Sequence, residues 1–114
     1  MNTGIERRRH PRAPLALPVV LMTPQVAIKG KTVNISVGGL ALLLFLETPK
    51  IGDEFQIALK SSEDHEMPVT CEKVWSGSII YDESVYNGIG VRFTKISTSD
   101  REIIASMVAE YYLI

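Results

Sequence analysis

The feature that most constrains the fold is a series of short apolar segments, each ended by turn-forming residues, that runs from residue 15 to about residue 95. In several of them apolar and polar side chains alternate, which is typical of a strand with one buried face. The predicted strands cover 15–22, 29–36, 40–45, 54–59, 67–80 and 88–93. Strands of this length and spacing predict a six-stranded antiparallel β-barrel or a sandwich. We favour the barrel because closure removes exposed strand edges.

The expected turns follow from glycine, proline and polar residues between these segments. Gly38 and Gly39 separate the second and third strands, so we expect a hairpin whose turn can take positive φ without steric cost. In the strand before it, the alternation places Val33 and Ile35 on one face, and Thr32, Asn34 and Ser36 on the other. Further loops or turns are expected at 49–53, 61–66, 82–84 and Asn87.

The periodicity changes after residue 95. Ser99 and Glu102 have the spacing of a capping box at the start of a helix. Apolar residues then recur at helical intervals, namely Ile103, Ile104, Met107, Val108 and Tyr111. The sequence therefore predicts one C-terminal helix that packs on the barrel.

Length and composition limit the chain to one domain. A chain of 114 residues with 46% hydrophobic content is expected to build a single core. No apolar run approaches the length of a membrane span, and the N-terminus does not resemble a secretory signal, so we expect no membrane span. The lone Cys71 has no partner for a disulfide or a metal pair, which suggests the cytoplasm.

Charge is unevenly distributed. The net charge is −1, but the first twelve residues carry +3 and the remainder carries −4. An acidic body does not attract nucleic acid over a broad face, so anion recognition is expected to be local to the N-terminal segment. Residues 1–13 lack a core-forming pattern and are expected to be flexible, with the barrel domain over 14–114.

Two segments carry recognisable chemistry. In the first, Arg7, Arg8, Arg9 and Arg12 offer guanidinium forks that suit phosphates and the edge of guanine, and His10 adds a further donor. By itself this segment is also compatible with a solvated basic tail. The second is Asn-Ile-Ser-Val-Gly-Gly at 34–39, where two polar side chains precede glycines that let a ligand approach the backbone. Alone it would be an ordinary hairpin.

In this order and at this separation, the two segments resemble the PilZ domain family of bacterial cyclic di-GMP receptors. The family pattern RxxxR corresponds to residues 8–12, and [DN]xSxxG corresponds to residues 34–39. Val74-Trp75 is similar to the family's tryptophan-bearing strand, and residues 90–93 to its last strand. The resemblance implies a PilZ-like barrel that receives a second messenger and has no catalytic activity.

The resemblance also implies roles for individual residues. Arg8 and Arg12 would hold guanine edges and phosphates, Asn34 and Ser36 would hydrogen-bond a guanine, and Gly39, after Gly38, would keep the turn open. Asn34 stands where many members have Asp, and a neutral amide pairs less strongly with guanine N–H groups. An arginine directly before the motif, here Arg7, is similar to that of members which bind an intercalated pair of ligands, and Arg9 within the motif is a further candidate contact. Trp75 would either stack on a guanine or pack under the C-terminal helix.

The expected function is therefore a cyclic di-GMP receptor whose arginine segment becomes ordered around the ligand and signals to a separate protein partner, with no other cofactor and no metal. A chain that begins at Met1 and holds one domain would act on that partner in trans. One alternative is a small nucleic-acid-binding barrel with a basic arm, which the acidic body disfavours. Another is an interaction module that binds no ligand. No motif of serine catalysis is present, so an enzyme is not expected.

Overall fold

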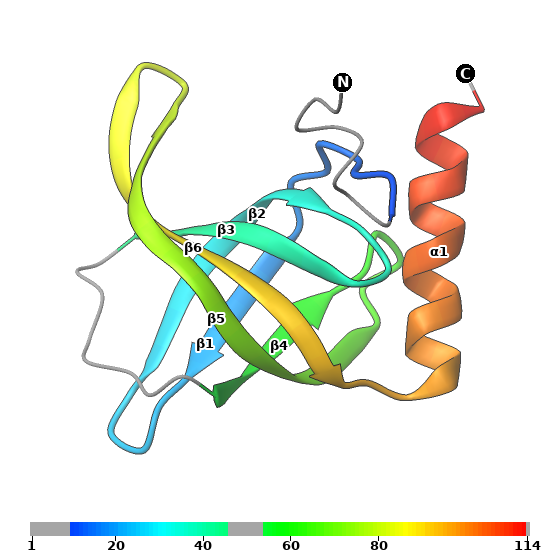
Figure 1. Cartoon of the computed structure of the whole chain (residues 1–114), viewed down its shortest axis with the longest axis horizontal. Helices are drawn as coiled ribbons and strands as arrows, with labels where there is room; N and C mark the ends of the chain where they lie inside the picture. The colour runs from blue at the N-terminus through cyan, green and yellow to red at the C-terminus, as the bar shows by residue number, and fades with distance from the viewer. Residues whose placement is uncertain (1–9, 46–53, 114) are drawn as a thin grey trace, which may run out of the picture.

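The computed structural model describes residues 10–45 and 54–113. Six strands form a closed antiparallel barrel in the order β1-β2-β3-β6-β5-β4, which confirms the predicted fold class. Figure 1 shows helix α1 standing beside the barrel and the β5–β6 hairpin extending beyond it. The elements are β1 (Pro18–Met22), β2 (Ala27–Ile35), β3 (Gly39–Leu44), β4 (Glu54–Lys60), β5 (Glu66–Tyr81), β6 (Ser84–Lys95) and α1 (Thr98–Tyr112).

The barrel closes because β1 pairs with β4 as well as with β2. The first and last strands of this order, β1 and β4, therefore leave no free edge between them. Alternate residues of each strand point inward and form one hydrophobic core. The most deeply buried side chains include Leu21, Ile35, Leu42, Ile57, Leu59, Met67 and Ile89. The predicted strand positions agree with these elements within a few residues, although the predicted loop at 49–53 lies outside the described residues.

The last two strands differ from the prediction. The turn between them is confined to Asp82 and Glu83, and Asn87 lies inside β6, where it pairs with Ser78 of β5. The expected turn at Asn87 is therefore wrong. Asparagine favours turns locally, but pairing between β5 and β6 keeps Asn87 within the strand.

Helix α1 covers the core with one face, as predicted. Ile104, Met107 and Val108 are buried in the core cluster, and Ile103 packs against it. Tyr111, which the apolar stripe also included, is 41% exposed. Within the described ranges, no helix has the length and apolar character needed to cross a membrane.

The helix begins earlier than the predicted capping box. Ser97 is the N-cap, and its hydroxyl accepts a hydrogen bond from the backbone N–H of Asp100 at 3.1 Å. The assignment of Ser99 as the cap is therefore wrong. Since Ser97 and Asp100 have the same spacing as Ser99 and Glu102, local sequence alone could not distinguish the two starts.

Candidate functional site

A surface depression of about 650 Å³ lies where five parts of the chain meet, one of which is Val74 of β5. Its lining includes His10 and Arg12 of the N-terminal segment, the β2–β3 turn at 36–39, residues 91–96 at the end of β6, and Arg101 of α1. Four of the predicted ligand-binding residues thus share one depression, namely Arg12, Ser36, Gly38 and Gly39. The other predicted arginines, Arg7, Arg8 and Arg9, lie outside the described residues.

A backbone bridge brings the two predicted motifs together. Ala13 is fully buried, its N–H donates to the carbonyl of Ile35 at 2.9 Å, and it accepts from the Ile35 N–H at 2.9 Å. The hydroxyl of Tyr112, at the end of α1, donates to the carbonyl of Arg12. Because Ile35 lies between Asn34 and Ser36, the bridge sets the end of the arginine segment beside the second motif. The predicted boundary after residue 13 falls at this attachment.

Ser36 holds the β2–β3 turn in shape. Its N–H donates to the carbonyl of Gly39 at 2.8 Å, and its hydroxyl donates to the same oxygen at 3.3 Å. The hydroxyl also accepts from the Gly38 N–H at 3.2 Å. The Phe93 N–H donates to the Gly38 carbonyl at 2.9 Å, which ties the turn to β6. Ser36 therefore has a structural role whether or not a ligand uses its hydroxyl.

We expected glycines in this turn because they tolerate positive φ. The structure shows another reason: their lack of a side chain leaves room for neighbouring groups. In the described part of the chain no glycine has positive φ. A Cβ on Gly39 would lie 2.2 Å from the carbonyl oxygen of Val91, and a Cβ on Gly38 would lie 2.8 Å from the ring of His10. The absence of side chains thus lets β6 and the imidazole approach the turn closely.

Asn34 does not line the depression directly. A β-bulge between Thr32 and Asn34 adds Val33 to the strand, so Thr32 and Ile35 are both fully buried. The prediction that Thr32 shares a face with Asn34 and Ser36 is therefore wrong, because a bulge interrupts the alternation. Within the described residues, the Asn34 Oδ1 atom is buried without a hydrogen-bond partner. Such an oxygen is costly to leave unpaired.

Trp75 lies on the surface of the sheet, 41% exposed, and its ring covers Gly90 of β6, where a Cβ would be 2.0 Å from the Trp75 Nε1 atom. Its packing therefore involves β6. The neighbouring Val74, not Trp75, lines the depression. Stacking of Trp75 on a ligand stays a prediction.

The depression is lined by basic side chains. Arg12, Arg92, Lys95 and Arg101 contribute to it, and among the described residues that form its wall none is acidic. Arg92 pairs with Glu72 at 2.9 Å between Nη2 and Oε2, and both side chains are exposed. A concave surface with cations on several sides favours an anionic ligand.

Sequence reasoning did not assign Arg92, Lys95 or Arg101 to the site. They come from β6 and α1 and match no short motif, so only the folded chain brings them to the turn. The one indirect signal is that basic residues are a minority in the acidic body and two of these three flank the predicted start of the helix, but it does not place them at the turn. His10 was considered as a donor, and it does line the depression.

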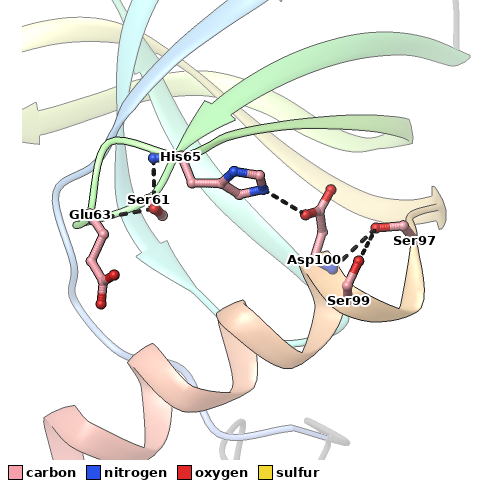
Figure 2. Close-up of polar contacts among 6 residues, drawn as sticks. All are labelled: Ser61, Glu63, His65, Ser97, Ser99 and Asp100. Carbon is pink, nitrogen blue, oxygen red and sulfur yellow. Dashed lines mark hydrogen bonds and ion pairs between the residues drawn. The ribbon is translucent and has the colours of Figure 1, made fainter.

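A second polar cluster holds the first turn of α1 (Figure 2). His65, at the end of the loop before β5, contacts the carboxylate of Asp100 at 3.1 Å between Nε2 and Oδ1. The loop is itself closed by Ser61, whose hydroxyl accepts from the backbone N–H of His65 at 3.1 Å and of Glu63 at 3.3 Å. The contact therefore joins the β4–β5 loop to the helix.

The PilZ domain profile matches residues 6–110, and this chain belongs to the PilZ domain family. The matched range includes both motifs and every strand, so the family assignment made from the motifs is confirmed. A search of curated protein sequences found no significant match.

Solved structures share the fold. The inhibitor of motility MotI/DgrA of Bacillus subtilis has a TM-score of 0.77 at 17% identity, over 94% of this chain and 51% of that chain. The PilZ domain of YcgR from Escherichia coli, solved with c-di-GMP, has a TM-score of 0.72 at 18% identity, over 92% of this chain and 91% of that chain. The MrkH–c-di-GMP complex of K. pneumonia has a TM-score of 0.76 at 22% identity, over 94% of this chain and 53% of that chain. This chain thus spans about half the length of MotI/DgrA and MrkH. At these identities the similarity establishes the fold.

Proposed function

We propose that this chain is a receptor for cyclic di-GMP, which it binds between the arginine segment, residues 7–12, and the basic depression. The observation that carries the proposal is the Ala13–Ile35 bridge, because it brings Arg12 and Ser36 to the same depression. The described residues that line this depression include basic side chains and no acidic ones. Two proteins that share the fold, YcgR and MrkH, were solved with c-di-GMP, which supports this choice of ligand. The role is that of a receptor without catalytic activity.

The side chains divide the recognition of guanine and phosphate between them. Arg8 and Arg12 grip phosphates and the O6/N7 edge of guanine through bidentate, charge-assisted hydrogen bonds. The Ser36 hydroxyl has a second lone pair that can accept from guanine while the turn is kept. Asn34 is half-buried, and a base that donates to its buried Oδ1 atom would supply the hydrogen bond which this oxygen lacks among the described residues.

Binding would couple to ordering of the arginine segment. Fixing a flexible segment costs conformational entropy, and charge-assisted bonds to the ligand offset that cost. The ordered segment would lie next to the end of α1, because Tyr112 already contacts Arg12. We propose that this rearranged surface contacts a protein partner in the bacterial cytoplasm, a compartment that also suits the free thiol of Cys71.

Calorimetric titration with cyclic di-GMP tests the ligand, with cyclic di-AMP and GTP as controls. We expect saturable binding of cyclic di-GMP that competing RNA and single-stranded DNA leave unchanged. Displacement by those polymers would favour the nucleic-acid-binding alternative, and no binding of cyclic di-GMP would contradict the proposal. If Arg7 enables the binding of an intercalated pair, the titration saturates at two ligands per chain. Saturation at one ligand per chain would contradict the intercalated pair.

The motif arginines should be needed for binding and not for stability. We expect Arg8→Ala and Arg12→Ala each to abolish detectable binding of cyclic di-GMP, because each removes a charged fork from the ligand, while the melting temperature changes little. Lys29→Ala, on the exposed part of β2, is the matched control and should bind normally. Full affinity in either arginine variant would contradict the assignment.

A further inference from the structure

We propose that Lys95 and Arg101, called here the basic wall, bind a phosphate of the ligand on the side of the depression that is built by β6 and α1. This inference rests on the proposed function and extends it to residues outside both motifs. Cyclic di-GMP carries two phosphodiester groups on opposite sides of its ring. The arginine segment can meet one of them, and the basic wall is placed to meet the other.

The charges of the basic wall are available to a ligand. Both side chains line the depression, both residues are exposed, and within the described part of the chain neither is paired with an acidic residue. Arg92 differs, because Glu72 already occupies its guanidinium at 2.9 Å. Exposed cations without a counter-ion gain most from an incoming phosphate, since no existing ion pair has to be broken first.

The backbone that carries Arg101 is held in place before any ligand arrives (Figure 2). Its neighbour Asp100 is 7% exposed, donates its backbone N–H to the Ser97 cap at 3.1 Å, and meets His65 of the β4–β5 loop at 3.1 Å. Ile104, one turn later, is fully buried in the core. A fixed helix start with one mobile cationic side chain lowers the entropic cost of binding, because only that side chain must be ordered.

The basic wall would also bring α1 into contact with the ligand at its first turn. At its last turn the same helix already touches the arginine segment, through the Tyr112 hydroxyl and the Arg12 carbonyl. A ligand bound by Arg12 and Arg101 would therefore join the N-terminal segment to both ends of one helix. Binding of the ligand would therefore change the surface around α1.

The test compares single and double substitutions in calorimetric titrations with cyclic di-GMP. Loss of one charge-assisted hydrogen bond weakens binding about tenfold, so we expect that effect from each of Lys95→Gln and Arg101→Gln, and a larger loss from the double variant. Arg101→Lys should keep part of the affinity because it keeps the charge. Lys29→Gln, which removes a cation from a site that does not line the depression, should bind as the unmodified protein does.

The dependence on salt separates a phosphate contact from a structural effect. Screening weakens exposed charge pairs, so binding to the unmodified protein should weaken with added salt more steeply than binding to the double variant. Equal affinities and equal salt dependence in the unmodified protein and the double variant would overturn the inference. Failure of the unmodified protein to bind cyclic di-GMP would instead contradict the proposed function, so the two failures are distinguishable.

Discussion

Gly38 and Gly39 are neighbours in the sequence, but different parts of the molecule restrict them. At Gly39 a side chain would meet the backbone of β6, which cannot move without breaking strand pairing. At Gly38 it would meet only the imidazole of His10, which can rotate. The two glycines should therefore respond differently to the same substitution.

We expect Gly39→Ala to lower the free energy of unfolding by about 1–3 kcal/mol, because the Cβ would lie 2.2 Å from the Val91 carbonyl oxygen. Gly38→Ala should change stability by less than about 0.5 kcal/mol and weaken cyclic di-GMP binding, since it displaces His10 at the depression. Guanidinium unfolding and calorimetry measure the two effects. Equal stability losses at both positions would contradict this account.

Cys71 illustrates how burial changes the chemistry of one residue. Burial, with a smaller contribution from the negative charge of Glu54, raises the pKa of its thiol from 9.0 to about 12. The folded protein therefore keeps the thiol protonated at a pH where the unfolded chain would ionise it.

The stability that this group contributes is complete below pH 9 and is lost as the pH rises towards 12, because only the unfolded chain gains from ionisation in that range. We expect the free energy of unfolding of the unmodified protein to fall more steeply over this range than that of Cys71→Ala. The comparison cancels the titration of lysines and tyrosines. Parallel curves would show that the thiol titrates normally. At pH 8 a thiol reagent should label Cys71 slowly in the native protein and at once in guanidinium.

At the scale of single elements, two serines near the start of α1, Ser97 and Ser99, both have the spacing of a capping box, but only Ser97 is the N-cap. The hydroxyl of Ser97 caps the helix through the Asp100 N–H, whereas among the described residues the hydroxyl of Ser99 hydrogen-bonds the Ser97 hydroxyl, at 3.4 Å, and caps no backbone N–H. We expect Ser97→Ala to cost about 1 kcal/mol of stability and Ser99→Ala much less. Chemical unfolding of the two variants measures the difference, and a larger loss at Ser99 would place the cap where local sequence predicted it.

The β5–β6 hairpin turns on two residues in a left-handed conformation, Asp82 with φ 51° and Glu83 with φ 66°. Such turns favour glycine, because a side chain is strained at these angles. We expect Glu83→Gly to raise the free energy of unfolding by up to about 1 kcal/mol. Ser84→Gly, in the adjoining strand, should lower it. Destabilisation by Glu83→Gly would indicate that the carboxylate contributes more than the strain costs.

At the scale of the whole molecule, the barrel was predictable because its information is local and repeated. Each strand shows its own alternation, and six such segments followed by one helical stripe leave few arrangements that bury all the apolar faces. The errors occurred where one element overrides another. Pairing with Ser78 keeps Asn87 inside β6, and the bulge at Val33 reverses the alternation in the middle of β2.

The candidate site was predictable in the same uneven way. The complete motifs predicted that Arg12 would lie near Ser36, Gly38 and Gly39, and the structure brings these four residues to one depression. Their contacts with a ligand stay a prediction. Lys95 and Arg101 could not be assigned, since each is an ordinary surface cation until β6 and α1 are placed beside the turn. Asn34 was also assigned to the site, but it does not line the depression, and it follows a bulge that no local pattern indicates.

The sequence by itself determined the strand pattern, the C-terminal helix, the uneven charge and the two motifs that identify the family, because these depend on neighbouring residues. Only the tertiary structure decided that Ala13 pairs with Ile35 and so joins the motifs. It also decided that the turn glycines provide room for β6 and His10, and that basic residues from β6 and α1 complete the depression. Contacts between residues far apart in the chain depend on closure of the barrel, which no local stretch of sequence encodes.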